Sequence, residues 1–166
     1  MGSVLVTCRQ IPELDWSQGK GQLRIDGISI GMSPKQAYAA MGESGGESME
    51  HVYNSKDGRT LFLGGSSVME VASFDCIYLP DGKKIQAGES IRTLASLWPI
   101  RVRPEKQGLV PFTIQLTDNG SWYEGAGELW VYVNTEGKIE YFDLSQAAAK
   151  AMGGPAFGKG QNSSPP

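Results

Sequence analysis

The chain has 166 residues, of which 40% are hydrophobic and 20% charged, so it can bury the core of one compact domain or of two small fused modules. Its net charge of -3 provides no positive field for phosphate backbones, which argues against nucleic acid as a partner. The two cysteines, Cys8 and Cys76, exclude a four-thiolate metal site and permit at most one internal disulfide. The sequence does not decide whether they pair.

The N-terminal segment, residues 1–22, has only a short apolar run that ends at Val6. It has no basic start and is far too short for a membrane span, so it is not a signal peptide as written. Cys8 follows Leu5-Val6-Thr7, which is weakly similar to the end of a bacterial lipoprotein signal, and lipidation of Cys8 is left open. Met1-Gly2-Ser3 could be native or could replace a removed leader.

Short helices are predicted where the sequence provides caps. Ser33-Pro34-Lys35-Gln36 has the pattern of a capping box with proline at the first helical position, and this helix should end at Gly42. A second helix should begin near Ser90 and end before Pro99. A weaker third helix is predicted over residues 145–152, followed by a flexible tail. The first helix is too short to be stable alone, so its alanine-rich face should pack on a sheet.

Strand signals occupy most of the remaining chain, and they are separated by dipeptides that favour hairpin turns. The predicted strands cover residues 23–30, 51–53, 60–63, 68–79, 110–117, 128–133 and 138–144. The turn dipeptides are Asp57-Gly58, Asp81-Gly82, Asn119-Gly120 and Glu136-Gly137. This order predicts an antiparallel meander.

A faint internal repeat suggests how the chain is organised. The capped helix and later turn of the first half align with those of the second half at an offset of about 55 to 57 residues. We therefore predict an α+β fold with two layers, in which short helices cover one face of an antiparallel sheet. Residues 23–86 and 87–144 would be similar helix-plus-hairpin units sharing the sheet, and residues 145–166 a short helix and tail. Chance similarity between two β-rich halves is the alternative.

The sequence provides few groups for catalysis. The imidazole of His51 and the thiols of Cys8 and Cys76 are the only ones of their kind, and no phosphate loop, nucleophile elbow or metal-binding helix motif surrounds them. Strand alternation predicts that Cys76 is a small buried residue, and His51 should lie at the surface. We therefore predict no catalytic, metal or cofactor-binding residue, and a protein that is not an enzyme.

The strongest functional signal is aromatic. In the strand 128–133, Leu129, Val131 and Val133 share one face, which places Trp130 and Tyr132 on the other. Large rings on an open sheet face exceed what a monomer usually exposes, so a partner protein should cover them. The predicted partner-binding residues are Trp130, Tyr132, Tyr141, Trp122 and Tyr123. Two alternatives could also bury this aromatic face: the third helix could fold back onto it, or two copies of the chain could associate through it.

Residues 28–36, reading Ile-Ser-Ile-Gly-Met-Ser-Pro-Lys-Gln, and the following Met41-Gly42, Val52-Tyr53 and Asp81-Gly82-Lys83, resemble the repeat of the SmpA/OmlA (BamE-like) envelope lipoproteins. A tandem pair of such units is similar to the β-lactamase inhibitory protein family. Residues 123–144 of this chain resemble the final hairpin of that family. The second copy departs from the pattern, because Gly88-Glu89-Ser90 lacks the methionine.

This resemblance implies a bacterial, periplasmic or secreted protein-binding module, inhibitor-like or envelope-assembly-like, although a cytoplasmic protein is possible because no signal peptide is present. The alternative function is a small-ligand carrier, or an enzyme subunit, with a pocket between sheet and helices. We expect no cofactor, no nucleic acid and no membrane span.

Overall fold

The computed structural model describes residues 23–46, 52–103, 105–106, 110, 112 and 116–145 of the chain. These residues form ten strands and two short helices. The strands are β1 (Arg24–Ile25), β2 (Val52–Asn54), β3 (Thr60–Gly64), β4 (Val68–Ser73), β5 (Cys76–Tyr78), β6 (Lys84–Gln86), β7 (Ile100–Arg103), β8 (Ser121–Gly125), β9 (Leu129–Val133) and β10 (Ile139–Ser145). The helices are α1 (Pro34–Ala40) and α2 (Ile91–Ala95).

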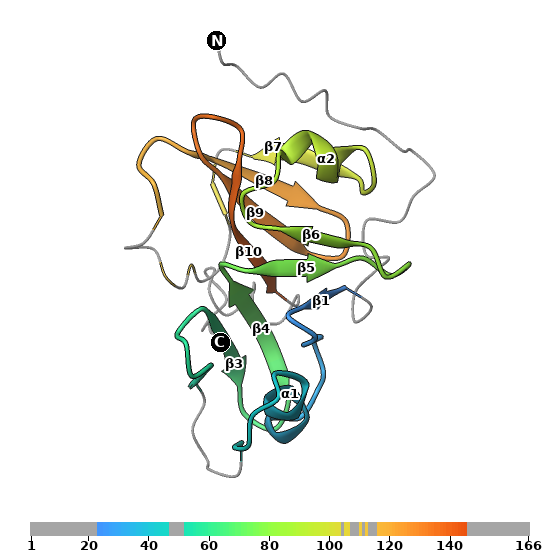
Figure 1. Cartoon of the computed structure of the whole chain (residues 1–166), viewed down its shortest axis with the longest axis vertical. Coiled ribbons are helices and arrows are strands. Elements are labelled where there is room, and N and C mark those ends of the chain that lie inside the picture. The colour runs from blue at the N-terminus through green and yellow to red at the C-terminus, as the bar shows by residue number, and fades with distance from the viewer. Residues whose placement is uncertain are drawn as a thin grey trace, which may run out of the picture.

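The strands form two antiparallel sheets. Seven of them lie in the order β2-β3-β4-β10-β9-β8-β7, and β1, β5 and β6 form a separate three-stranded sheet (Figure 1). The central pair, β4 and β10, comes from distant parts of the chain, and its register places Phe142 opposite Ser73 and Ser145 opposite Glu70. Strands from both sides of residue 86 therefore belong to one sheet. The predicted division into two units there stays a prediction.

The prediction of a two-layer α+β fold with helices on one face of a single sheet is wrong. The protein is mostly β, because its helices have only seven and five residues and a second sheet accompanies the first. Three strands were missed. Strands β6 and β7 are short and rich in charged residues, and β8 follows a turn directly, so none of them shows the long alternation by which strands are recognised.

A corner in the middle of the sequence creates the second sheet. Residues 68–79 read as one strand, but β4 ends at Ser73 and β5 begins at Cys76. The guanidinium of Arg59 fixes this corner, since it donates to the carbonyl oxygen of Phe74 at 2.7 Å and pairs with the carboxylate of Asp75. The chain can thus leave the large sheet and pair with β1 and β6 instead.

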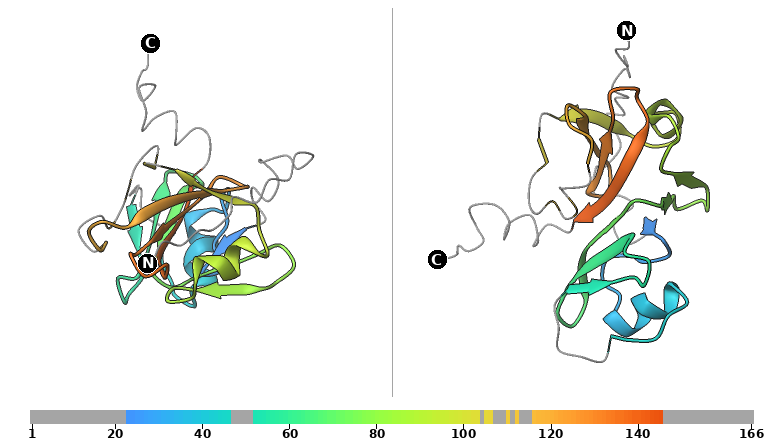
Figure 2. Two further views of the ribbon diagram at one scale, coloured as in Figure 1. Left: turned by 90° about the horizontal axis from the view of Figure 1, so that it is seen from above. Right: turned by 60° about the vertical axis from the view of Figure 1, so that its left-hand side comes forward.

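The helix starts are confirmed. Ser33 accepts from the backbone N–H of Gln36 at 3.1 Å, and the Gln36 side chain accepts from the Ser33 N–H at 2.9 Å, which completes the capping box. Gly42 follows α1 with a φ of 76°, a left-handed conformation that suits glycine. Ser90 caps α2, although this helix ends at Ala95. Figure 2 shows α1 beside the strands β2 to β4 and α2 near β7 to β9.

The main core lies on one face of the seven-stranded sheet. There the sheet packs against both helices and the small sheet, and Tyr38 of α1 contacts the rings of Tyr53 and Phe62 edge to face. Leu129, Val131 and Val133 belong to this core, as their alternation predicts. Their burial excludes water from the side of the sheet that the helices cover.

Several predictions fall on residues outside the described part of the chain. They concern Cys8, His51, most of the strand 110–117 and the third helix, of which only Ser145 is described, as the last residue of β10. Among the described residues, no helix is long and apolar enough to cross a bilayer.

Candidate functional site

The aromatic residues predicted to bind a partner lie on two sides of the large sheet. Trp130 and Tyr132 lie opposite the main core, as predicted, and the rings of Trp122 and Tyr141 join them there. Tyr123 belongs to the main core instead. The structure therefore gathers four of the five residues on one face.

That face is not open, and this part of the prediction is wrong. Trp130 is 3% exposed, Tyr132 8% and Tyr141 0%. Described residues of the β7–β8 connection lie on this face: the Phe112 ring is tilted against that of Phe74, with centroids 4.9 Å apart, and Leu116 packs on the same cluster. The rings form a second core, because Phe112 and Leu116, which the sequence places in a predicted strand, pack against them.

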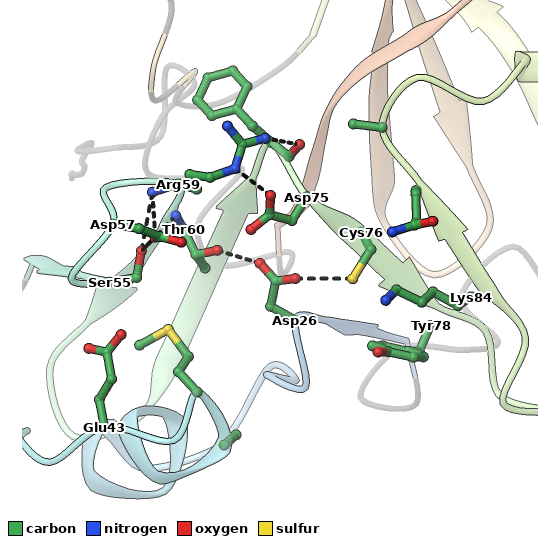
Figure 3. A pocket seen from close by; sticks show the side chains of 15 residues that line it. Asp26, Glu43, Ser55, Asp57, Arg59, Thr60, Asp75, Cys76, Tyr78 and Lys84 are labelled. Atoms are coloured by element: carbon green, nitrogen blue, oxygen red, sulfur yellow. Dashed lines mark hydrogen bonds and ion pairs between the residues drawn. The ribbon is translucent and has the colours of Figure 1, made fainter.

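A polar pocket of about 520 Å³ lies where the two sheets and the end of α1 meet (Figure 3). Its lining comes from the turn after β1, the chain after α1, the β2–β3 turn, the β4–β5 corner and the hairpin of β5 and β6. All of these segments are turns or strand ends, where side chains can face a cavity without leaving backbone groups unpaired.

The carboxylate of Asp26 forms the floor of this pocket. Its Oδ2 accepts from the hydroxyls of Thr60 and Ser73, the latter at 2.6 Å, and its Oδ1 accepts from the thiol of Cys76 at 3.1 Å. Thr60 and Ser73 are also 3.0 Å apart. Asp26 thus joins the turn after β1 to β3, β4 and β5, and three donors satisfy its charge.

Cys76 is a free, buried thiol, which confirms its predicted burial. Burial, together with the hydrogen bond to Asp26 and that carboxylate's charge, raises the pKa of Cys76 to about 12. The thiol therefore stays protonated at neutral pH. A protonated thiol is a poor nucleophile and a poor metal ligand.

Charged side chains of both signs line the walls above this floor. Arg59 and Asp75 pair with one another at the corner. The ammonium of Lys84 makes no hydrogen bond or ion pair with any described residue, and it lies 5.8 Å from the centroid of the Tyr78 ring. Figure 3 shows this ammonium directed toward the middle of the pocket, with Glu43 and Asp57 on the opposite side.

The two opposite carboxylates accept hydrogen bonds from residues of the β2–β3 turn. Glu43 accepts from the backbone N–H of Lys56 at 3.1 Å. Asp57 accepts from the Ser55 hydroxyl at 2.6 Å and from the Arg59 N–H at 3.0 Å, and these bonds, led by that of Ser55, lower its pKa. Asp57 is therefore negative at neutral pH.

Sequence reasoning missed this pocket. Asp57-Gly58 and Asp81-Gly82 were interpreted only as turns, and nothing near Asp26 indicated that it would meet residues 34 to 50 positions further along the chain. Among the described residues, no group of three or more His, Cys, Asp or Glu side chains could hold a metal ion. Comparisons of the chain with protein-family models, curated proteins and solved structures found no match.

Proposed function

We propose that the chain is a non-enzymatic binding domain whose pocket takes a small molecule carrying both an ammonium and an acidic group. The observation that carries this proposal is the separation of charge across the pocket. The ammonium of Lys84, without an ion pair or hydrogen bond among the described residues, faces Glu43 and Asp57 (Figure 3). A zwitterion would place its acidic group at Lys84 and its ammonium at the two carboxylates.

The dimensions and chemistry of the pocket support a small polar ligand. Its volume of about 520 Å³ falls within the range of about 300 to 1,000 Å³ typical of small-molecule sites. Hydrogen bonds between charged groups are about twice as strong as neutral ones, so two opposite ends would fix the ligand's orientation. The hydroxyl-bound Asp26 at the floor would give the site a rigid base.

Binding is favoured over catalysis by the state of the groups at the floor. The Cys76 thiol is protonated and donates to Asp26, and that carboxylate already has three donors. Neither group is poised to attack a ligand or to accept its proton. This supports the expectation from sequence that the protein is not an enzyme.

The proposal replaces the partner-binding face with the second sequence-based hypothesis, a small-ligand carrier. A protein partner stays a prediction, but the open face of Trp130 and Tyr132 no longer supports it, because both rings are buried. The resemblance to the SmpA/OmlA repeat, with the inhibitor role and periplasmic location that it implies, likewise stays a hypothesis.

Calorimetric titration with glycylglycine tests the proposal. We expect binding, with clearly weaker binding of N-acetylglycine and glycinamide, which each lack one of the two charges. Lys84→Met should weaken glycylglycine binding by about tenfold or more, since a hydrogen bond to a charged group contributes about 1.5 to 3 kcal/mol.

The neighbouring lysine provides the matched control. Lys83 is exposed and pairs with Asp81 at 3.2 Å outside the pocket, so Lys83→Met should bind glycylglycine as the unchanged chain does. Equal losses in the two lysine variants, or capped analogues that bind as well as the zwitterion, would refute the charge-separation proposal. So would the absence of binding at millimolar concentrations.

A further inference from the structure

A second cluster of charged side chains is buried on the covered face of the large sheet, away from the pocket. Asp143 and Ser145 lie on this face of β10, and Glu70 of β4 is opposite Ser145. Lys106, in the β7–β8 connection, places its Nζ 3.3 Å from Oε2 of Glu70 and 3.4 Å from Oδ2 of Asp143. The three charged side chains are 0 to 2% exposed.

The protons in this cluster are arranged unusually. The Ser145 hydroxyl oxygen lies 2.9 Å from an oxygen of both Glu70 and Asp143, but a hydroxyl has only one proton to donate. A second proton must therefore reside on a carboxyl group. Burial, followed by the charge of Asp143 and a hydrogen bond with it, raises the pKa of Glu70 to about 9. Glu70 is thus a carboxylic acid at neutral pH.

An amine, an acyl group and a proton carrier consequently meet in a site that excludes water. We propose that Lys106 and Asp143 form an intramolecular amide, an isopeptide bond, in the folded chain, and that Glu70 moves the proton. This inference does not depend on the proposed ligand pocket.

The reaction is a condensation and needs no co-reactant. The Lys106 ammonium passes a proton to the Asp143 carboxylate, which leaves a neutral amine beside a carboxylic acid. The Nζ lone pair attacks Cγ of Asp143, and the Nζ–Cγ bond forms. Glu70 takes a proton from Nζ and returns one to the departing hydroxyl of Asp143, whose Cγ–O bond breaks. One water molecule leaves, and a neutral amide remains beside the Glu70 acid.

The hydrogen bonds select Asp143 as the acyl group. Tyr141 donates to its Oδ2 at 3.2 Å, and Ser145 lies 2.9 Å from its Oδ1, so hydroxyl groups face both oxygens. Donors in these places stabilise the negative oxygen of a tetrahedral intermediate. Burial raises the pKa of Tyr141, so its hydroxyl keeps the proton that it donates.

The surroundings hold the amine in place. The Lys106 Nζ is 5.9 Å from the centroid of the Trp130 ring, and that ring packs edge to face against Trp122. Fixing two reactants in a close arrangement removes most of the entropic cost of their reaction. The scarcity of water opposes hydrolysis of the amide once it has formed.

Mass spectrometry of the purified, fully denatured chain tests the proposal. We expect a mass lower than that of the sequence by one water molecule. Digestion and tandem spectra should show a branched peptide in which Lys106 is joined to Asp143, and trypsin should not cleave after Lys106. Glu124→Gln is the control, because Glu124 pairs with Arg101 and Arg103 rather than with the cluster, and it should keep the loss.

Two variants complete the test. Lys106→Arg keeps the positive charge but removes the reacting amine, and it should have the full mass. Glu70→Gln should have the full mass or form the bond at least tenfold more slowly. A full-mass wild-type chain would overturn the proposal without any variant. A water loss that persists in Lys106→Arg, or a branch at Glu70 instead of Asp143, would also overturn it.

Discussion

At the scale of single residues, two carboxyl groups of the chain have contrasting surroundings. Asp26 accepts hydrogen bonds from three donors at the floor of the pocket, whereas Glu70 is buried beside Asp143. Burial and the neighbouring charge of Asp143 favour the neutral acid form of Glu70. In both cases the neighbouring residues are distant in sequence.

The Glu70 environment predicts a pH dependence of stability. Its pKa rises from 4.5 to about 9 on folding, so the folded chain retains a proton that the unfolded chain releases. The stabilisation is therefore complete below about pH 4.5 and is lost as the pH rises toward 9, with a slope of up to about 1.4 kcal/mol per pH unit. The free energy of unfolding, measured with urea at a series of pH values from roughly 5 to 9, tests this dependence.

Glu70→Gln should flatten this dependence, because glutamine does not titrate. Glu124→Gln should leave it unchanged, since Glu124 lies outside the cluster and pairs with arginines. An unfolding free energy in the wild-type chain that increases over the same pH range would show that Glu70 is not the proton-binding group.

At the scale of elements, the covering of the second sheet face depends on the connection between β7 and β8. Tyr132 of β9 anchors its end, since the phenol donates to the Thr117 carbonyl oxygen at 2.5 Å and accepts from the Gly120 N–H at 2.9 Å. A side chain at Gly120 would collide with the Tyr132 ring, which explains the glycine there. The ring and the connection therefore fix one another.

Tyr132→Phe tests this anchor. Removing the hydroxyl takes away two part-buried hydrogen bonds to the backbone, so the free energy of unfolding should fall by about 1 to 2 kcal/mol. Tyr78→Phe is the control, because the Tyr78 hydroxyl lies at the pocket wall and the ring is partly exposed; it should change stability by less than about 0.5 kcal/mol. Chemical denaturation measures both, and equal effects would argue against the anchor.

Local signals made some elements predictable. The capping box at Ser33 and Gln36 involves four consecutive residues, and the alternation that separates Trp130 from Val131 lies within one strand. The covering by Phe112 and the meeting of Asp26 with Cys76 depend on contacts between distant segments. Because no local pattern encodes such contacts, the sequence predicted which face the rings occupy but neither their burial nor the pocket.

At the scale of the whole molecule, the pairing of β4 with β10 connects the first and second halves of the described chain in one sheet. The main core packs on one face of this pair, and Glu70, Asp143 and Ser145 lie on the other. An amide between Lys106 and Asp143 would tie the covering connection to β10, and the chain-entropy estimate for a loop of that length is about 4 kcal/mol of stabilisation. The pocket lies where the two sheets and the end of α1 meet, and Phe74 of the second core is one of its lining residues.

The location of ligand binding separates the pocket from the aromatic face most directly. In a nitrogen–proton correlation spectrum of the labelled chain, titration with glycylglycine should shift the backbone amides of Thr60, Cys76 and Lys84. The indole N–H signals of Trp122 and Trp130 should stay in place. Shifts of those indoles without changes at the pocket amides, or no shifts at all, would contradict a binding function at this pocket.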